Sequence, residues 1–503
     1  MELTLNQAAI DCYDKVFSQT VRKEESQDSV VPDTLPDIGE ILCTSGNVLI
    51  RSKDVGEGRV RIEANIPVKV AYAPEEGEGT YCLEVNIPLY VSMEDDAIPE
   101  KCLCVAELRL AGLETRILNP RKISVRAETL FSVGCYAAGQ IAFAGAPEQA
   151  GEDVNVLEQT VTVTPACAVT EKTFVLTDEF TIPDAMPPAA VILSRQTLLQ
   201  AEDVKAVGTK LIVKGSARSS LLYVSDEMRA GAVEFSTGFS QIIEVKTMPE
   251  DPFASVSLLL SGAYYDLSRG DGRTGEMELH VVAQAVVCGN AEAVCLADAY
   301  SNRCALEMTM DAVDISRIRR PLVLRETLRG QLNTAKPVAE ILQGCFDLGA
   351  VRAEGNAVTL PVTVCMHYRT PDGSLCSAKQ TFQVKFSCPL EDGEYLEPVG
   401  VSAQELYLAP SAGGAELRLP LELQVFVRET ETVESVTAIT YDESSPLDLS
   451  DQPTLVILRA GSGDDLWALA KQNHSTVRAI TEANDLDAQG GGWEKLILIP
   501  KMV

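Results

Sequence analysis

An internal repeat constrains the fold of this chain more than any other sequence feature. Residues 31–36 (VPDTLP), followed by Glu40-Ile41-Leu42, align without a gap with residues 182–187 (IPDAMP), followed by Val191-Ile192-Leu193. A weaker third copy, without the Pro-Asp pair, occupies residues 336–342 (KPVAEIL), again about 150 residues downstream. Self-similarity at this spacing predicts three units of domain size.

Each unit is expected to be rich in β-strands. Downstream of each proline, a pair of strands is predicted around a glycine: residues 58–63 into 68–72, 208–213 into 221–223, and 355–360 into 362–368. Each pair ends in a tyrosine followed by a turn cluster, and each unit closes with strands of period-two alternation at 121–128, 277–283 and 416–423. This pattern predicts a mainly β protein made of tandem antiparallel β-sandwich-like domains.

Two segments outside the repeat are interpreted differently. A short N-terminal helix is predicted within residues 4–20, because Leu5, Ala9, Ile10, Tyr13, Val16 and Phe17 fall near helical spacing. It would pack on the first β domain or dock on another protein. Residues 441–453 are polar, punctuated by proline and without periodicity, which is typical of a linker.

The repeat resembles the SPOCS domain of endospore-forming Firmicutes. Units of that family carry a Pro-Asp-x-x-Pro segment, a glycine-centred hairpin and a late strand that begins here at residues 119–123 (NPRKI). The resemblance covers most of the first 430 residues and is weaker in the third unit. It implies a lead-in at 1–24, SPOCS-like domains at 25–140, 141–290 and 318–430, and a linker at 431–451.

The last fifty residues or so, 452–503, predict a small βααβ module. An apolar strand at 455–458 precedes a glycine-rich turn at 461–464, whose side-chain oxygens can cap a helix starting at Asp465. Ser475 begins a second helical pattern, and residues 495–499 return as a strand that ends at Pro500. A core of this size requires short loops.

The amino-acid sequence of this module resembles that of the LysM family, which binds glycans that contain N-acetylglucosamine, such as peptidoglycan and chitin. The resemblance implies a shallow groove between the loop before the first helix and the loop after the second. The groove residues are then Gly463, Asp464, Asp465 and Leu466 on one side and Asn484, Asp485, Leu486 and Asp487 on the other.

Two positions depart from the LysM pattern. Asp465 stands where threonine is usual, and its carboxylate would repel an anionic glycan. Trp493 stands where a glycine usually precedes the last strand, and is expected to be either a platform for a sugar or a protein, or a core residue. Trp467, within the first helical pattern, is expected in the core.

Charge and hydropathy exclude several classes of partner. The formal net charge is −31, which repels phosphate backbones and anionic lipids, so no nucleic acid is expected as a partner. The acidic surface is either a plain solvated surface or a site for a basic partner. No apolar run reaches the roughly 18 residues that span a bilayer, so no membrane span is expected, and the acidic N-terminus has no signal-peptide pattern.

No motif indicates catalysis. The three histidines, His280, His367 and His474, are not in zinc-ligand spacing, and there is no nucleophile elbow, phosphate loop or metalloprotease helix. We therefore expect no enzymatic activity, no cofactor and no metal site. The fourteen cysteines, including the pair Cys102 and Cys104, are expected as small buried residues, with late oxidative cross-linking as the alternative.

Tandem SPOCS units ahead of a LysM module are similar to the SipL-type family of spore-coat morphogenetic proteins of clostridia. The resemblance implies an adaptor in the mother-cell cytoplasm at the forespore surface and spore coat. Its partners would be the coat's morphogenetic ATPase and other coat proteins, with the module bound to peptidoglycan of the cortex or to a coat protein. A general peptidoglycan-binding protein of the cell envelope and a peptidoglycan hydrolase are the alternatives.

Overall fold

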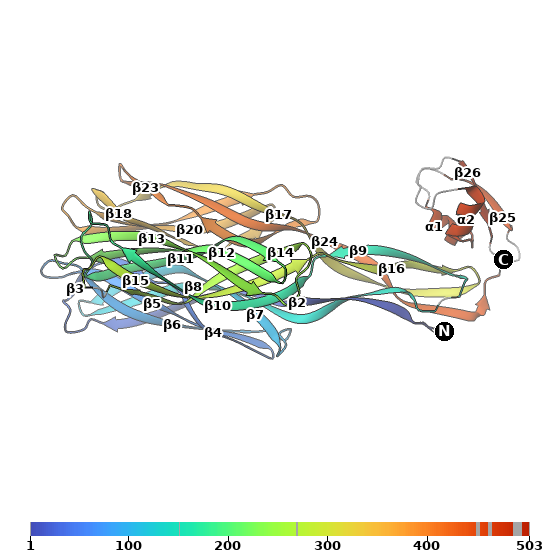
Figure 1. Cartoon of the computed structure of the whole chain (residues 1–503), viewed down its shortest axis with the longest axis horizontal. Helices are drawn as coiled ribbons and strands as arrows, with labels where there is room; N and C mark the ends of the chain where they lie inside the picture. The colour runs from blue at the N-terminus through green and yellow to red at the C-terminus, as the bar shows by residue number, and fades with distance from the viewer. Residues whose placement is uncertain are drawn as a thin grey trace.

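Three successive units with the same order of strands make up most of the computed structural model (Figure 1). The structure describes residues 2–149, 151–267, 270–448, 453–460, 465–485 and 495–501. In each unit the first long strand pairs antiparallel with the last long strand, β2 with β8, β10 with β15, and β17 with β24. The prediction of a mainly β protein is confirmed.

One sheet of each unit, which we call the lead sheet, contains this first and last strand. Its strands are β2 (Leu5–Val30), β7 (Cys102–Asn119) and β8 (Lys122–Pro147); β10 (Ala166–Thr181), β14 (Pro252–Asp266) and β15 (Thr274–Gly289); and β17 (Cys304–Asn333), β22 (Glu394–Ala403), β23 (Tyr407–Ser411) and β24 (Gly414–Pro446). The last strand lies in the middle of each lead sheet, between β2 and β7 in the first unit, between β10 and β14 in the second, and between β17 and the pair β22 and β23 in the third. Ala166 of β10 also pairs with Tyr13 of β2, which joins the first two lead sheets into one of six strands.

A second sheet faces each lead sheet. Its strands are β3 (Ile38–Ser45), β4 (Leu49–Gly56), β5 (Arg59–Pro74) and β6 (Tyr81–Glu94); β11 (Val191–Val207), β12 (Lys210–Val224) and β13 (Ala230–Glu244); and β18 (Glu340–Leu348), β19 (Arg352–Glu354), β20 (Ala357–Arg369) and β21 (Leu375–Ser387). Alternate apolar side chains of the two sheets share a core; in the third unit, Val362 and Val364 of β20 lie in one cluster with Leu421 and Leu423 of β24.

The predicted pair of strands around each glycine is one unbroken strand: β5, β12 or β20. The glycines at the start of these segments, Gly58, Gly208 and Gly355, lie instead in the tight turn before the strand, with φ of +71°, +59° and +57°. A φ in this range favours glycine, which explains why the residue recurs in each unit. The prediction of two strands is therefore wrong in all three units.

Prolines inside two of these strands explain where their partners are divided. Pro67 lies between the part of β5 that pairs with β3 and the part that pairs with β4, and Pro361 lies between the parts of β20 that pair with β18 and β19. Proline has no backbone N–H to donate, so the ladder is interrupted there. The second unit has no proline in β12, and its partner β11 is continuous.

The N-terminal segment is a strand, not a helix. β2 pairs with β8 along nearly its whole length, and bulges interrupt the register between Leu5 and Gln7 and between Lys15 and Phe17. Each bulge shifts by one residue which side chains face inward. The apolar residues therefore lose strict alternation and imitate helical spacing, which is why the sequence pattern predicted a helix.

The predicted linker at 431–451 is also largely strand. β24 continues to Pro446, where it pairs with Cys304 at the start of β17. Val436 and Ile439 of this segment are fully buried. The residues that follow them are polar although they belong to the same strand, which is why the sequence predicted a linker. Residues 449–452 lie outside the described residues.

The long strands extend beyond the units as a stalk. We define the stalk as β9 (Val154–Val163), β16 (Ala291–Ser301) and β1 (Glu2–Leu3), together with residues 5–13, 138–147, 304–315 and 433–446 of β2, β8, β17 and β24. Three strand pairs thus run side by side and enclose apolar clusters, with residues such as Leu5, Phe143, Leu296 and Val436. Figure 1 shows the stalk projecting from the three units toward the C-terminal module.

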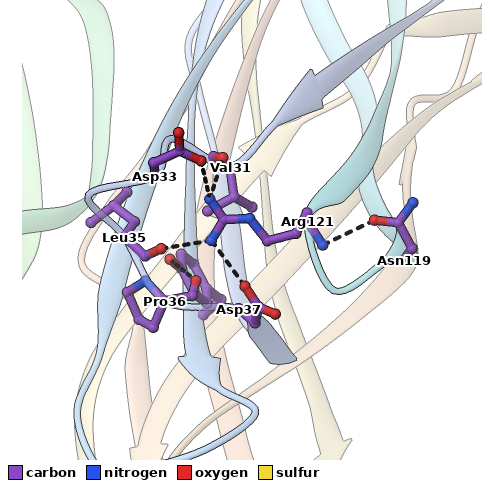
Figure 2. A network of polar contacts seen from close by, with 8 residues as sticks. Val31, Asp33, Leu35, Pro36, Asp37, Asn119 and Arg121 are labelled. Carbon is purple, nitrogen blue, oxygen red and sulfur yellow. Dashed lines mark hydrogen bonds and ion pairs between the residues drawn. The ribbon is translucent and has the colours of Figure 1, made fainter.

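An arginine holds the repeated Pro-Asp-x-x-Pro segment, which we call the proline loop, in the first unit (Figure 2). Arg121 Nη1 donates to Leu35 O at 2.8 Å and to Asp37 Oδ1 at 2.9 Å, and Nη2 donates to Val31 O at 2.9 Å and Asp33 Oδ1 at 3.2 Å. One guanidinium thus satisfies two backbone carbonyls and two carboxylates, which a lysine cannot do with a single ammonium group.

The second unit repeats this device with different atoms. Arg273 Nη1 donates to Pro183 O and Met186 O, both at 3.1 Å. The tyrosine that ends the central strand adds a further bond, since Tyr72 Oη donates to Pro36 O at 3.0 Å and Tyr223 Oη to Pro187 O at 2.9 Å. The recurring proline, tyrosine and arginine therefore form one mutual support in each of these two units.

We predict that Arg121→Ala loosens the proline loop of the first unit. Loss of the charge-assisted bonds should cost about 1–3 kcal/mol of local stability, read as faster hydrogen exchange of amides 31–38. Arg121→Lys should restore only part of the protection, because the ammonium cannot bridge four acceptors. Lys122→Ala, which removes a neighbouring surface charge, is the control. Unchanged exchange in Arg121→Ala would show that the loop is held by other contacts.

Candidate binding module at the end of the stalk

The C-terminal module contains β25 (Leu455–Ala460), α1 (Leu466–Gln472), α2 (Val477–Asn484) and β26 (Lys495–Pro500), in that order. The two strands pair antiparallel, from Leu455 opposite Pro500 to Ala460 opposite Lys495. Both helices cover one face of this small sheet, with a buried core of Leu466, Ala470, Ile480, Ile497 and Ile499. In a module this small, the same side chains must serve both folding and binding.

Two predicted groove residues are exposed at helix ends. Asp465 is the N-cap of α1, where its side chain accepts a hydrogen bond from Trp467 N at 3.1 Å. Asp485 ends α2 in the left-handed conformation, with φ of +50°. Aspartate and asparagine tolerate this conformation better than other residues with a Cβ. Both carboxylates face solvent.

Two other predicted groove residues build the module itself. Leu466 is only 6% exposed and lies in the apolar core. Asn484 Nδ2 donates to Leu498 O at 2.6 Å, and Asn484 Oδ1 accepts from Leu498 N at 2.8 Å, so this side chain extends the pairing of β26 to α2. Substitution of either residue would test folding before it tests binding.

The remaining predicted groove residues, Gly463, Asp464, Leu486, Asp487 and Trp493, lie outside the described residues.

An aliphatic surface covers the face of the small sheet opposite the helices. Leu455, Ile457, Leu496 and Leu498 are between 36% and 67% exposed, and Ile457 stands directly opposite Leu498 in the ladder. Side chains of a strand alternate between its two faces, so Ile497 and Ile499 point to the core while their neighbours Leu496 and Leu498 point outward. Neighbouring exposed aliphatic residues of this kind mark sites of contact with other molecules more often than single ones do.

The stalk reaches into the core of the module through one tyrosine. Tyr300 of β16 is 6% exposed and belongs to the apolar cluster of the module. Its hydroxyl donates to Ser475 O at 2.9 Å, and its ring lies 4.8 Å from the ring of Trp467 in a T-shaped arrangement. The module is therefore seated on the stalk through side-chain packing as well as through the chain itself.

A carboxylate of the stalk completes this contact. Asp298 Oδ2 accepts from Trp467 Nε1 at 2.8 Å, and both oxygens accept from Lys471 Nζ, at 2.7 and 2.8 Å. Trp467 was predicted in the core. Its ring packs against the core, and its one polar group, Nε1–H, donates to Asp298. Asp298 and Tyr300 had no detectable signal in the sequence, because about 170 residues separate them from the module and only folding brings them together.

The charge state of Asp298 determines when the contact holds. Burial raises the pKa of Asp298, but the hydrogen bonds from Lys471 and Trp467 outweigh it, so the pKa is lowered from its ordinary value of 3.8. A carboxyl group with a depressed pKa in the folded state stabilises the contact above its unfolded pKa. That stabilisation is lost only as the pH falls through the lower, folded pKa.

Comparisons with models of protein families, with curated proteins and with solved structures found no match to this chain. No helix in the described part of the chain is long and apolar enough to cross a membrane.

We predict that Asp298→Ala releases Trp467 from the stalk. In a Trp493→Phe background, Trp467 is the only tryptophan, so its emission should shift to longer wavelength as the indole becomes hydrated. In the parent, the emission maximum should stay at short wavelength from neutral pH down to about pH 4 and shift to longer wavelength in stronger acid. Asp314→Ala, on the stalk strand β17, is the control. Identical spectra for Asp298→Ala and the parent would contradict the contact.

Proposed function

We propose that the chain is a non-enzymatic adaptor of the spore envelope. It tethers coat proteins, including the coat's morphogenetic ATPase, to the forespore surface and cortex from the mother-cell side. The C-terminal module, a LysM-type domain in this proposal, is the anchor and binds peptidoglycan glycan or a coat protein. The three SPOCS-like units are the scaffold that carries it.

The observation that carries the proposal is the position of the module. It sits at the end of the stalk, in contact with Asp298 and Tyr300, while the three units lie at the other end (Figure 1). An adaptor needs binding surfaces that two partners can occupy at once, and separation along an elongated molecule provides this. A catalytic protein would instead need convergent polar groups within one cleft.

The contact with the stalk leaves the two exposed groove residues that the structure describes accessible. It uses Trp467, Lys471 and Ser475, whereas Asp465 and Asp485 at the opposite ends of the two helices remain exposed. Backbone groups at such helix ends can bond the acetamido groups of a glycan. The two carboxylates add negative charge, which disfavours an anionic glycan and favours a less charged or basic ligand.

The aliphatic surface of Leu455, Ile457, Leu496 and Leu498 supports a coat protein as a ligand of the same module. Sugars bind mainly through hydrogen bonds and aromatic faces, whereas a row of aliphatic side chains fits an apolar protein surface. In this proposal, a glycan would bind near Asp465 and Asp485 at the helix ends, and a coat protein would bind the aliphatic surface.

The proposed groove is tested with Asp465→Asn and Asp485→Asn in the full chain. Asparagine also caps helices and tolerates the left-handed conformation, so the fold should be unchanged while both charges are removed. We expect tighter co-sedimentation with insoluble cortex peptidoglycan, by about threefold to tenfold, as expected for removal of two like charges near an anionic ligand. The increase should shrink at high salt.

The control for this experiment is Glu482→Gln, which removes an exposed carboxylate of α2 that pairs with Arg478. It should leave co-sedimentation unchanged. If neither the parent nor the two variants sediment with peptidoglycan, the module is not a glycan anchor. Weaker binding of coat proteins to both variants would instead assign the groove to a protein ligand.

A further inference from the structure

Two cysteines and a histidine of the third unit gather at one point. Cys345 of β18 stands directly opposite Cys365 of β20, and His367 follows two residues later on the same face of β20. The Sγ atoms and a ring nitrogen of His367 lie within 4.8 Å of one another, with Cys365 Sγ 3.9 Å from His367 Nε2. Separations of this size allow one small ion to contact all three groups after minor side-chain adjustment.

These side chains point away from the core of their own unit. Val364, Met366 and Tyr368 of β20 are fully buried in that core, so alternation directs Cys365 and His367 to the other face. The strands that flank His367 contact the other two units there: Gln343 donates to Ser220 of the second unit, and Ser377 to Leu42 O of the first. The cluster therefore lies where the three units meet.

One ring nitrogen of the histidine contacts Cys365 Sγ, and the other has no partner among the described residues. His367 is 3% exposed, and its Nδ1 has no hydrogen-bond partner among the described residues. A buried ring nitrogen without a partner costs free energy, and native proteins rarely leave one so. Cys345 and Cys365 are half-buried residues.

The donor atoms of these three residues select the kind of ion. The thiolate is the form of cysteine that binds metals, and thiolate with imidazole selects borderline and soft ions over Mg²⁺ or Ca²⁺.

We propose that Cys345, Cys365 and His367 form a binding site for a zinc-type transition-metal ion. The two thiols release their protons to solvent as they bind the ion, and the neutral imidazole donates a lone pair. Three protein ligands leave one position of a tetrahedral ion for water. No electron transfer is involved. The bound ion would tie β18 to β20 in the unit whose proline loop lacks the Pro-Asp pair.

Sequence spacing did not reveal this site, and the expectation of no metal site is what the proposal replaces. Cys365 and His367 are two residues apart, which suits a strand but no common zinc motif, and the third ligand is 20 residues upstream. Only the register of β18 against β20 brings Cys345 opposite Cys365.

The test uses the full chain, reduced and stripped of metal, and titrates it with Co²⁺ in the absence of oxygen. We expect one Co²⁺ per chain, with the intense visible bands of a tetrahedral ion and thiolate-to-cobalt absorption, both removed by added Zn²⁺. Cys365→Ser and His367→Asn should each weaken binding by at least about 100-fold. Circular dichroism of the variants establishes that they are folded.

The first unit supplies the matched control. Cys104 and Cys135 form a similar cross-strand pair, with Cys102 beside them. Cys104→Ser should therefore leave the cobalt spectrum unchanged. The proposal is overturned if the parent shows no tetrahedral bands or if folded His367→Asn binds as tightly as the parent. It is also overturned if mass spectrometry of the chain, alkylated on isolation and before any reduction, finds Cys345 and Cys365 joined as a disulfide.

Discussion

The antiparallel ladder between the first and last long strand of each unit is the interaction on which the rest of the structure depends. It closes each unit by joining residues far apart in the sequence; in the third unit, for example, it pairs Leu324 with Leu423 and Asn333 with Gly414. Beyond the units the same ladders continue as the stalk, so stalk and units are made of the same strands. A module held by Asp298 and Tyr300 at the end of β16 is thereby positioned relative to all three units. Contacts of such sequence separation form slowly, so we expect the ladders to limit folding.

The sequence predicts the parts of this fold that repeat locally. The proline, the glycine turn and the buried tyrosine recur because each unit needs them at the same place, as Tyr72 and Tyr223 show with their bonds to Pro36 and Pro187. It fails where long-range pairing overrides local pattern. Bulges in β2 disguised a strand as a helix, and the polar end of β24 resembled a linker until its pairing with β17 was known.

The candidate sites divide in the same way. The elements of the C-terminal module follow from capping and periodicity, because helices and turns of this size are specified by nearby residues. Which side chains bind and which support the fold could not be inferred: Leu466 and Asn484 proved to hold the module together. Asp298, Tyr300 and the group around His367 were invisible for a different reason, since tertiary structure alone brings their partners to them.

The adaptor account is tested most directly by whether one molecule joins two partners. Immobilised cortex peptidoglycan is incubated with the purified morphogenetic ATPase of the coat, with and without the full chain, and retained ATPase is measured. The account predicts that the ATPase is retained only with the chain present, in proportion to bound chain, and that excess free chain abolishes the bridge by occupying each partner separately. The account is contradicted if peptidoglycan retains the chain but not the ATPase, or if it retains the ATPase when the chain is absent.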